Sequence, residues 1–295
     1  MQRKIVVSLL TTQQEFQQMQ AEDARAAAAR LGLELDVIFA ENNAIQQIHQ
    51  LYQYVHAPEA ERPSAIVMEA VSRDGMERLA RNALKAGIMW VAQQWKTPYL
   101  EKLRAEDRAA PIHSVSVDEE EIGRIQAQQL RALRPRGGAA LFLQGPLQAD
   151  TAVDRLRGLE QGLAGSGIVL RAVLNGDWTA ESASRAVASW LRLKTMESTE
   201  IDIVGSQNDT MAAGARQALE QLRPEWARLP FTGCDGLPGG GRQMVEKGQL
   251  AATVIKPTTT GPAIDLVARR LKGELVPPDV ILHAQSYPPL TGLGK

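Results

Sequence analysis

Cysteine is almost missing from this sequence of 295 residues, and Cys234 is the single example. The chain therefore has no intrachain disulfide and no cluster of thiolates that could bind zinc. Its four histidines (His49, His56, His113 and His283) are scattered, and their spacing does not indicate a metal site. No apolar run approaches the ~18 consecutive residues that a membrane-spanning helix needs. We therefore predict no metal, no cofactor and no membrane-embedded segment.

Neither positive nor negative charge is in excess. The chain has 33 Lys and Arg residues and 34 Asp and Glu residues, which gives a net charge of −1. This balance gives no electrostatic reason to expect nucleic acid or an anionic membrane as the main partner. Residues 5–10 form an apolar stretch after Arg3 and Lys4, but it is too short for a signal peptide and no small-residue cleavage site follows. We expect a strand there, in a chain that has no export signal and is either cytoplasmic or a mature form without its leader.

Short β-branched or apolar runs alternate with longer helical segments along the chain, and 44% hydrophobic residues supply a sizeable core. In residues 208–222, for example, Met211, Ala215, Leu219 and Leu222 recur at helical spacing. Such strand–helix alternation predicts parallel sheets with helices on both faces. The predicted strands cover residues 4–10, 34–39, 64–68, 87–92, 112–117, 139–143, 168–174, 201–205, 230–234 and 252–255.

The length of the chain and the repeated rhythm of its two halves predict two doubly wound lobes rather than one large open sheet. The break between the lobes is expected near Val117 and Asp118, where a strand ends. Glu119, Glu120 and Glu121 then open a helix. We interpret this acidic run as a complement to the positive end of the helix dipole.

Ligands of doubly wound sheets bind beyond the carboxyl ends of the strands, so the residues that directly follow each strand are the candidate site. These residues are rich in amides and indoles, with a few charges of each sign. Amides and carboxylates bond neighbouring hydroxyls, and aromatic rings cover the C–H face of a sugar ring, so the set favours a polyhydroxylated solute. It includes Gln14, Phe16, Gln94, Trp95, Trp178, Asn208, Asp235 and Lys256.

Four segments, in this order, resemble motifs of periplasmic sugar-binding proteins of the ribose-binding type. They are Arg155-Leu156-Arg157-Gly158-Leu159 (Arg-x-x-Gly-Phe in that family), residues 207–215 (Gln-Asn-Asp-Thr-Met-Ala-Ala-Gly-Ala), residues 233–236 (Gly-Cys-Asp-Gly) and residues 248–254 (Gly-Gln-Leu-Ala-Ala-Thr-Val). Asp118 with Gly123, and Leu271-Lys272-Gly273, fit as well. The same core occurs as the effector domain of lactose-repressor-like regulators, but there is no room before Lys4 for their DNA-reading helix-turn-helix.

The resemblance implies an α/β fold of the type 1 periplasmic binding proteins, with two doubly wound parallel-sheet lobes joined by three hinge crossovers. The N-terminal lobe would comprise residues 1–116 and 256–283, and the C-terminal lobe residues 117–255 and 284–295. Such receptors close on their solute by hinge bending. Carried over position by position, the cleft between the lobes would take Gln14, Phe16, Gln94 and Trp95 from the first lobe, Arg155, Trp178, Asn208 and Asp235 from the second, and Lys256 at the hinge.

Some of these positions depart from the family pattern. Gln94-Trp95 stands where the family often has an Asp-Arg or Asp-Ser pair, Glu69-Ala70 replaces Asn-Pro, and Lys256 replaces a common Gln. If Lys256 enters the pocket, then Arg155, Lys256 and Asp235 sum to two positive charges and one negative. This sum leads to the hypothesis that the ligand is a sugar acid or another anionic polyol.

Structural alternatives remain open for several of these residues. Asp235 precedes Gly236 and could simply form a turn. Asn208 could cap its helix, with its spare amide facing the ligand. Lys256 could be a solvated hinge lysine, and the two tryptophans could pack under loops. Residues 238–241 (Pro-Gly-Gly-Gly) lack the Gly-Lys-Ser/Thr ending of a phosphate-binding loop and are interpreted as a flexible connection.

Together these observations predict a non-enzymatic solute receptor, most simply the component of a sugar-type ABC transporter that captures a sugar, polyol or sugar acid and docks to a membrane permease. Its periplasmic or extracytoplasmic location is implied by the resemblance alone. The alternative is a ligand-sensing module for a signalling partner such as a membrane kinase. No Gly-x-Ser-x-Gly elbow or Ser/His/Asp arrangement is readable, so an enzyme acting on a phosphorylated sugar is the most distant alternative.

Overall fold

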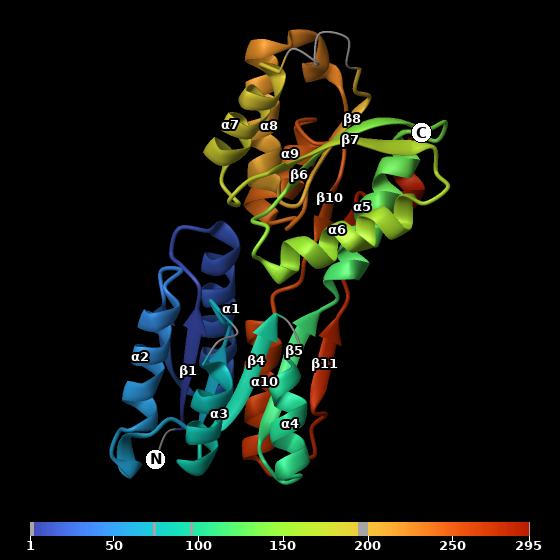
Figure 1. The fold of residues 1–295 in the computed structure, drawn as a ribbon. Helices are drawn as coiled ribbons and strands as arrows, with labels where there is room; N and C mark the ends of the chain where they lie inside the picture. Colours follow the sequence, from blue (N-terminus) through green and yellow to red (C-terminus); the bar gives the residue numbers. More distant parts are fainter. Residues whose placement is uncertain (1–2, 73–74, 95–96, 194–199, 295) are drawn as a thin grey trace. The chain divides into compact units, whose positions relative to one another are not determined.

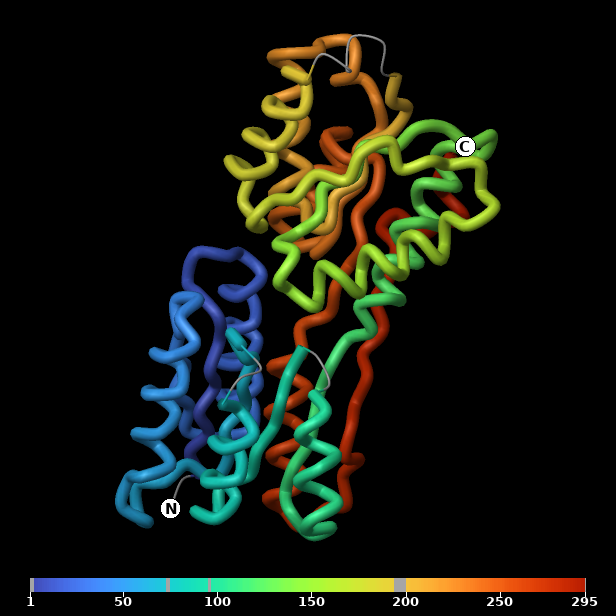
Figure 2. Tube along the Cα trace, viewed as in Figure 1, coloured from blue at the N-terminus to red at the C-terminus, as the bar shows by residue number. Residues whose placement is uncertain are grey.

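The chain folds into two compact units, each made of separate stretches of sequence (Figure 2). The computed structural model describes residues 3–72, 75–94, 97–193 and 200–294. Unit 1 comprises Met1–Val117 and Thr258–Leu282, and unit 2 comprises Asp118–Pro257 and His283–Lys295. The chain thus passes between the units after Val117, Pro257 and Leu282. The predicted lobe boundaries need correction at four residues, because Val117 lies in unit 1 while Lys256, Pro257 and His283 lie in unit 2.

Unit 1 is built on a six-stranded sheet with the order β11-β5-β4-β3-β1-β2. Every neighbouring pair in this sheet is parallel. The order places β1 inside the sheet, with β2 on one side and β3 on the other, so the winding direction changes between β1 and β3. The strands are β1 (Lys4–Leu9), β2 (Glu34–Phe39), β3 (Ala65–Met68), β4 (Met89–Gln94), β5 (Ile112–Val117) and β11 (Asp279–Leu282).

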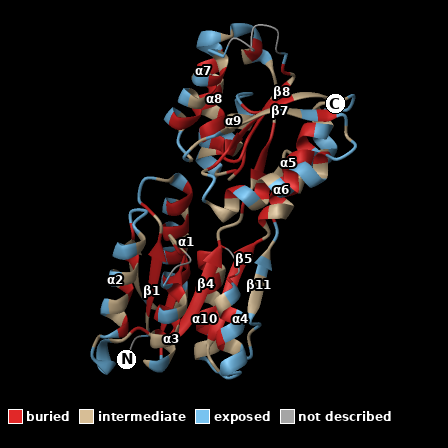
Figure 3. Ribbon diagram, in the orientation of Figure 1, coloured by how far each residue is buried: buried red, intermediate tan, exposed pale blue. Residues whose placement is uncertain are grey.

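Helices cover both faces of this sheet, because its strands are apolar on both sides. Val6 and Ile66 pack into one buried cluster with α2, α3 and α4, while Ile5 and Val67 face α1 and α10. Figure 3 shows β1, β4 and β5 as buried and the outer faces of the helices as largely exposed. The helices are α1 (Glu15–Leu31), α2 (Ala44–Val55), α3 (Met76–Lys85), α4 (Pro98–Glu106) and α10 (Thr260–Leu271).

Unit 2 repeats this topology with a four-stranded parallel sheet of order β7-β6-β8-β9. Here the winding direction changes between β6 and β8. Parallel bridges from Thr232 to Ala252 and from Asp235 to Ile255 continue the order toward β10. The strands are β6 (Gly138–Gln144), β7 (Ile168–Asn175), β8 (Ile203–Ser206), β9 (Phe231–Thr232), β10 (Thr253–Ile255) and β12 (Gln285–Tyr287).

The sheet of unit 2 is also covered on both faces (Figure 1). Leu141 and Val204 pack with α7 and α8, whereas Phe142 and Ile203 pack with α5 and α6. The alternation of these neighbours along β6 and β8 is the period of two that strand geometry requires. The helices are α5 (Glu119–Leu133), α6 (Asp150–Leu163), α7 (Ala180–Leu191), α8 (Asp209–Leu222) and α9 (Gln243–Glu246).

The predicted α/β class with two doubly wound parallel sheets is confirmed, and the details that differ lie at strand ends and late in the chain. Strands β11 and β12 were not predicted, and β12 pairs with β10 in antiparallel orientation. Strand β4 begins and ends two residues later than predicted, so Gln93 and Gln94 end the strand instead of following it. The segment Pro238–Arg242 is a helical turn kinked at Gly240, where φ is −111° and ψ is −110°, and it leads into α9.

A helix that crosses a bilayer needs about 20 consecutive, predominantly apolar residues. In the part of the chain that the structure describes, no helix is both long enough and apolar enough to cross a membrane.

Candidate functional site

Arg155 is the centre of a polar cluster at the carboxyl edge of the unit 2 sheet. It lies on α6, the helix that follows β6, and its side chain is buried. Its Nε donates to Glu119 Oε2 (2.6 Å) and its Nη1 to the backbone carbonyl of Gln207 (2.7 Å), which directly follows β8. Burial alone would lower the pKa of the guanidinium, but the carboxylates of Glu119 and Asp235 are among the groups that raise it. Arg155 is therefore a fixed, permanent positive charge at the point where the winding direction of this sheet changes.

Trp178 lies beside this charge. The Arg155 guanidinium is 5.9 Å from the centre of the indole ring, within the range of a cation–π contact. Trp178 follows β7 with a positive φ of 73°, and its ring closely approaches the backbone at Gly145, just after β6. A Cβ placed on Gly145 would lie 2.2 Å from the indole, so this glycine leaves the room that the ring occupies. The indole is partly exposed and packs against the core formed by α7 and α8.

Asn208 performs two structural tasks at the start of α8. Its Oδ1 accepts a hydrogen bond from the backbone N–H of Met211 (2.8 Å), which caps the helix, as the alternative interpretation predicted. Its Nδ2 donates to the carbonyl of Trp178 (2.9 Å). The amide nitrogen thus holds the backbone of Trp178 with one of its two N–H groups, and the expectation that the other faces the ligand stays a prediction.

This double role leads to a prediction for Asn208→Ala. Loss of the cap should lower the free energy of unfolding by about 1 kcal/mol. Loss of the bond to the Trp178 carbonyl should weaken ligand binding in addition. Asn43→Ala is the matched control, because Asn43 caps α2 of unit 1 through the same contact, a 3.0 Å bond from Gln46 N. Urea denaturation should show at least as much destabilisation for Asn208→Ala as for Asn43→Ala, and titration calorimetry should show weaker binding only for Asn208→Ala. Equal affinities would contradict the second role.

Asp235 follows β9 and forms the turn into Gly236, with a φ of 100° at Asp235. Its backbone bonds to Val254 and Lys256 hold it in the extended sheet. Its side chain is only partly buried, and it is close enough to Arg155 to influence the pKa of the guanidinium. The preceding Cys234 is buried, and burial together with nearby carboxylates raises the pKa of its thiol to about 12. Cys234 is thus a neutral apolar side chain, while Asp235 presents a carboxylate at the edge.

Lys256 is buried rather than solvated, and it belongs to unit 2. Its Nζ forms an ion pair of 3.2 Å with Glu119 Oε1. Glu119 therefore joins Lys256 to Arg155, although the sequence analysis assigned it only to the helix dipole. Burial would raise the pKa of Glu119, but the charges of Arg155 and Lys256 lower it below the ordinary value. Glu119 lies two residues after β5 of unit 1, so the rule about strand ends did not indicate its place in the unit 2 cluster.

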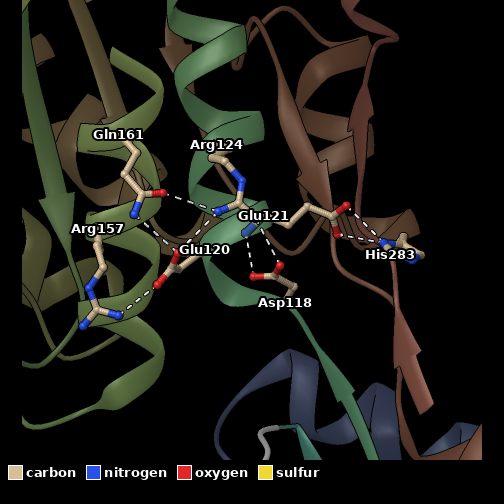
Figure 4. A network of polar contacts seen from close by, with 7 residues as sticks. All are labelled: Asp118, Glu120, Glu121, Arg124, Arg157, Gln161 and His283. Carbon is tan, nitrogen blue, oxygen red and sulfur yellow. Dashed lines mark hydrogen bonds and ion pairs between the residues drawn. The ribbon is translucent and has the colours of Figure 1, made fainter. Parts of the chain in front are cut away.

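The other two glutamates of the acidic run are partly buried and make separate polar contacts (Figure 4). Glu120 contacts Arg157 and Gln161 of α6, and Glu121 pairs with His283 at 3.1 Å. Asp118 caps α5 by accepting from the backbone N–H of Glu121. The dipole interpretation thus applies to the partly buried start of α5, whereas Glu119 is directed inward to the cluster around Arg155.

In unit 1, Gln94 is linked to two helices by a buried network of amides and hydroxyls. Its Nε2 donates to Thr259 Oγ1 (3.0 Å), and the same hydroxyl accepts from Gln20 Nε2 of α1 (3.1 Å). The neighbouring Gln93 accepts from Thr260 Oγ1 (2.9 Å) at the start of α10. Gln94 has a φ of 74°, so this edge also has a residue in the left-handed region. The network fixes the carboxyl end of β4.

The other predicted residues of unit 1 lie at the start of α1. Phe16 is buried in its first turn, on the same face as Gln20 one turn later. Gln14 is partly buried and precedes the helix, where its carbonyl accepts from the backbone N–H of Gln18. Gln94 is connected to this helix through Thr259 and Gln20. The predicted Trp95 lies outside the described residues.

Glu69 is a further polar residue at this edge that the sequence analysis did not include among the candidates. It directly follows β3 and is buried, with its Oε2 accepting from Gln17 Nε2 at 2.9 Å. Gln17 also accepts from the backbone N–H of Leu10, just after β1. Glu69 and Gln17 therefore occupy the point where the winding direction of this sheet changes. In the sequence, the indication of this residue is that Glu69-Ala70 replaces the Asn-Pro of the family pattern.

A protein metal site needs several His, Cys, Asp or Glu side chains close together. Outside residues 1–2, 73–74, 95–96, 194–199 and 295, no group of three or more His, Cys, Asp or Glu side chains is suited to hold a metal ion.

Two polar carboxyl edges on doubly wound parallel sheets define a class of ligand-binding α/β proteins. The family model described as "periplasmic binding protein domain" matches residues 5–274 of this chain. The chain therefore belongs to the periplasmic binding protein family, which confirms the resemblance predicted from its motifs.

Curated relatives and solved structures agree with this assignment. The chain is 22% identical over 263 residues to the galactofuranose-binding protein YtfQ of Escherichia coli, covering 88% of this chain and 79% of that protein. It is 24% identical over 257 residues to the ribose import binding protein RbsB of Salmonella typhimurium, covering 86% and 80%. An ABC transporter periplasmic solute binding protein from Actinobacillus succinogenes, solved with bound D-allose, has a TM-score of 0.84 at 20% identity and 97% coverage of both chains.

Proposed function

We propose that this protein is the solute receptor of an ABC transporter and that it binds a sugar or a sugar-like polyol without converting it. One structural observation carries this proposal. Among the described residues, the non-glycine residues with positive φ are Glu41, Asn42, Gln94, Trp178 and Asp235. Three of these five (Gln94, Trp178 and Asp235) end a strand or lie three residues after the end of one, and they belong to the predicted binding set. Such strained positions concentrate at ligand-binding sites, because their energy must be offset by the surrounding structure.

The polar edge of each unit supplies groups that suit a polyhydroxylated ligand. In unit 2, we propose that Asp235 and Arg155 bond hydroxyl groups and that the Trp178 indole covers the C–H side of the ring. In unit 1, we propose that Gln94 and the start of α1 contribute. Amide and carboxylate groups of this kind orient a neutral polyol through directional hydrogen bonds. The complete proposed set is Gln14, Phe16, Gln94, Trp95, Arg155, Trp178, Asn208, Asp235 and Lys256.

The names of the relatives support the same ligand class. They specify galactofuranose, ribose and D-allose, all of them neutral sugars. Their transporter names also support a membrane permease as the partner of this protein and an extracytoplasmic location. The alternative of a signalling partner predicts recruitment of a membrane kinase instead. Capture of the protein on permease-containing vesicles, in the presence of its sugar, would support the transport role.

A thermal-shift screen over neutral pentoses, hexoses, inositols and sugar acids tests the proposal. A tight ligand should raise the midpoint of unfolding by mass action, and calorimetry should give a single site. NMR spectra of the sugar after prolonged incubation should be unchanged, because the protein is not expected to catalyse a reaction. No shift with any sugar would contradict the receptor role, and a new sugar species would contradict the absence of catalysis.

Variants at the polar edge of unit 2 test whether the solute binds there. Asp235→Asn keeps a residue that tolerates positive φ but removes the charge, and it should weaken binding at least tenfold because a charge-assisted hydrogen bond is lost. Asp265→Asn is the matched control, because Asp265 pairs with Arg30 on the outer side of unit 1 and is 44% exposed. Equal affinities of the two variants would remove Asp235 from the site.

A further inference from the structure

The carboxylate of Glu119 is shared between two buried cations at the polar edge of unit 2. Its Oε2 lies 2.6 Å from Arg155 Nε and its Oε1 lies 3.2 Å from Lys256 Nζ. The three side chains are only 4%, 2% and 7% exposed, respectively. Glu119 is therefore not a surface charge that happens to be near a helix end, but the counter-ion of both cations.

Burying this arrangement is favourable only because the charges compensate one another. A buried ion without a partner is strongly destabilising. Arg155 also donates to the Gln207 carbonyl, which uses a second N–H of the guanidinium. With Glu119 in place, the positive charges of Arg155 and Lys256 are directed inward, toward a protein carboxylate, and are less available to an incoming anion.

The other charged groups of this edge are also balanced. Asp209 is buried and accepts from the Gly236 N–H (2.8 Å) and the Thr253 hydroxyl (2.7 Å). Arg242 is half-buried and donates to the Gly236 carbonyl (2.9 Å). The cations Arg155, Lys256 and Arg242 thus match the carboxylates Glu119, Asp235 and Asp209 in number. The hypothesis of an anionic ligand omitted Glu119, so the positive surplus on which it rested is absent.

We propose that Glu119 determines the charge specificity of this receptor, because it neutralises Arg155 and Lys256 and thereby favours uncharged polyols over sugar acids. This assignment rests on the proposed function, that is, on binding of the solute at this edge. Glu119 acts through its two partners, so it is a positioning residue rather than a direct ligand of the solute.

The test compares pairs of ligands that differ in one carboxylate. The probes are D-galactose with D-galacturonate and D-glucose with D-glucuronate, and calorimetry measures the ratio of affinities for each pair. The wild-type protein should prefer the neutral member. Glu119→Gln keeps the size of the side chain but leaves one uncompensated positive charge, and it should shift the ratio toward the acid by at least tenfold. Glu119→Gln combined with Lys256→Gln restores the charge balance and should return the ratio toward that of the wild type.

The double variant also separates specificity from folding. A purely structural role for Glu119 would weaken both members of a pair equally and leave the ratio unchanged, and this result would overturn the proposal. If Glu119→Gln does not fold, Lys256→Gln alone is decisive, because its surplus negative charge should move the ratio further toward the neutral sugar. A wild-type preference for the acids would overturn the assignment of charge specificity to Glu119, but it would leave the receptor function standing. If neither the wild type nor any variant binds a neutral or acidic probe, the proposed function itself is contradicted, and the role of Glu119 with it.

Discussion

Replacement of Arg155 by alanine is expected to abolish solute binding and to lower the free energy of unfolding by about 3–5 kcal/mol, the usual range when one partner of a buried ion pair is removed. The buried Glu119 carboxylate would keep only Lys256, and the Gln207 carbonyl would lose its donor. The Trp178 indole would also lose the guanidinium beside it. Chemical denaturation and titration calorimetry measure the two effects.

Arg157→Ala is the matched control for this prediction. Arg157 lies two residues further along α6, but its side chain is 53% exposed and pairs with Glu120 and Asp154 on the surface. Exposed ion pairs of this kind contribute about 0–1 kcal/mol, so this variant should keep nearly all its stability and its affinity. If the two variants were equally stable, the buried cluster would not have the energetic role assigned to it.

Arg155→Lys provides an intermediate case. The ammonium preserves the charge but cannot reach Glu119 and the Gln207 carbonyl with the fixed geometry of a guanidinium. Partial stability with weak binding is therefore expected. This result would show that the directions of the N–H groups are required in addition to the charge.

Most of the fold could be predicted from the sequence because its strands are buried on both faces. Continuous apolar runs such as residues 65–68 and 139–143 are recognisable without tertiary information. Strands β11 and β12 lack this signal. Ile281 of β11 is 55% exposed at the edge of its sheet, and Pro277 and Pro278 precede the strand. Pairing with β5 stabilises β11, and the local sequence does not reveal that contact.

The candidate site was predicted less completely than the fold. The rule that ligand-binding groups follow strands selected Arg155's neighbours Trp178, Asn208 and Asp235, which the structure places around one sheet edge. The rule did not reveal that Glu119 joins Arg155 to Lys256, because these residues are far apart in the sequence and their ion pairs depend on how α5 crosses α6. The charge count made from the sequence therefore omitted one carboxylate of this cluster, that of Glu119.

The crossing of α5 and α6 explains the glycine of the Arg-x-x-Gly segment. A Cβ on Gly158 would lie 2.1 Å from the Glu120 carbonyl oxygen, and one on Gly123 would lie 2.0 Å from the Arg155 carbonyl oxygen. Each helix thus approaches the backbone of the other where a side chain is missing. This close approach sets the positions of Glu119 on α5 and Arg155 on α6. Gly158 therefore allows the helix crossing that brings Arg155 to Glu119.

Gly158→Ala should therefore lower the free energy of unfolding by about 1–3 kcal/mol, although alanine is the better helix former, because the methyl group would push against backbone atoms that cannot move aside. The altered crossing should also weaken solute binding by displacing Arg155 from Glu119. Gly292→Ala is the control, because a Cβ there has no neighbour within 4 Å. Urea denaturation of both variants, followed by calorimetry with the same sugar, measures the difference. A stabilised Gly158→Ala protein with unchanged affinity would mean that helix propensity outweighs the contact, and that the close crossing is not what holds the ion pair in place.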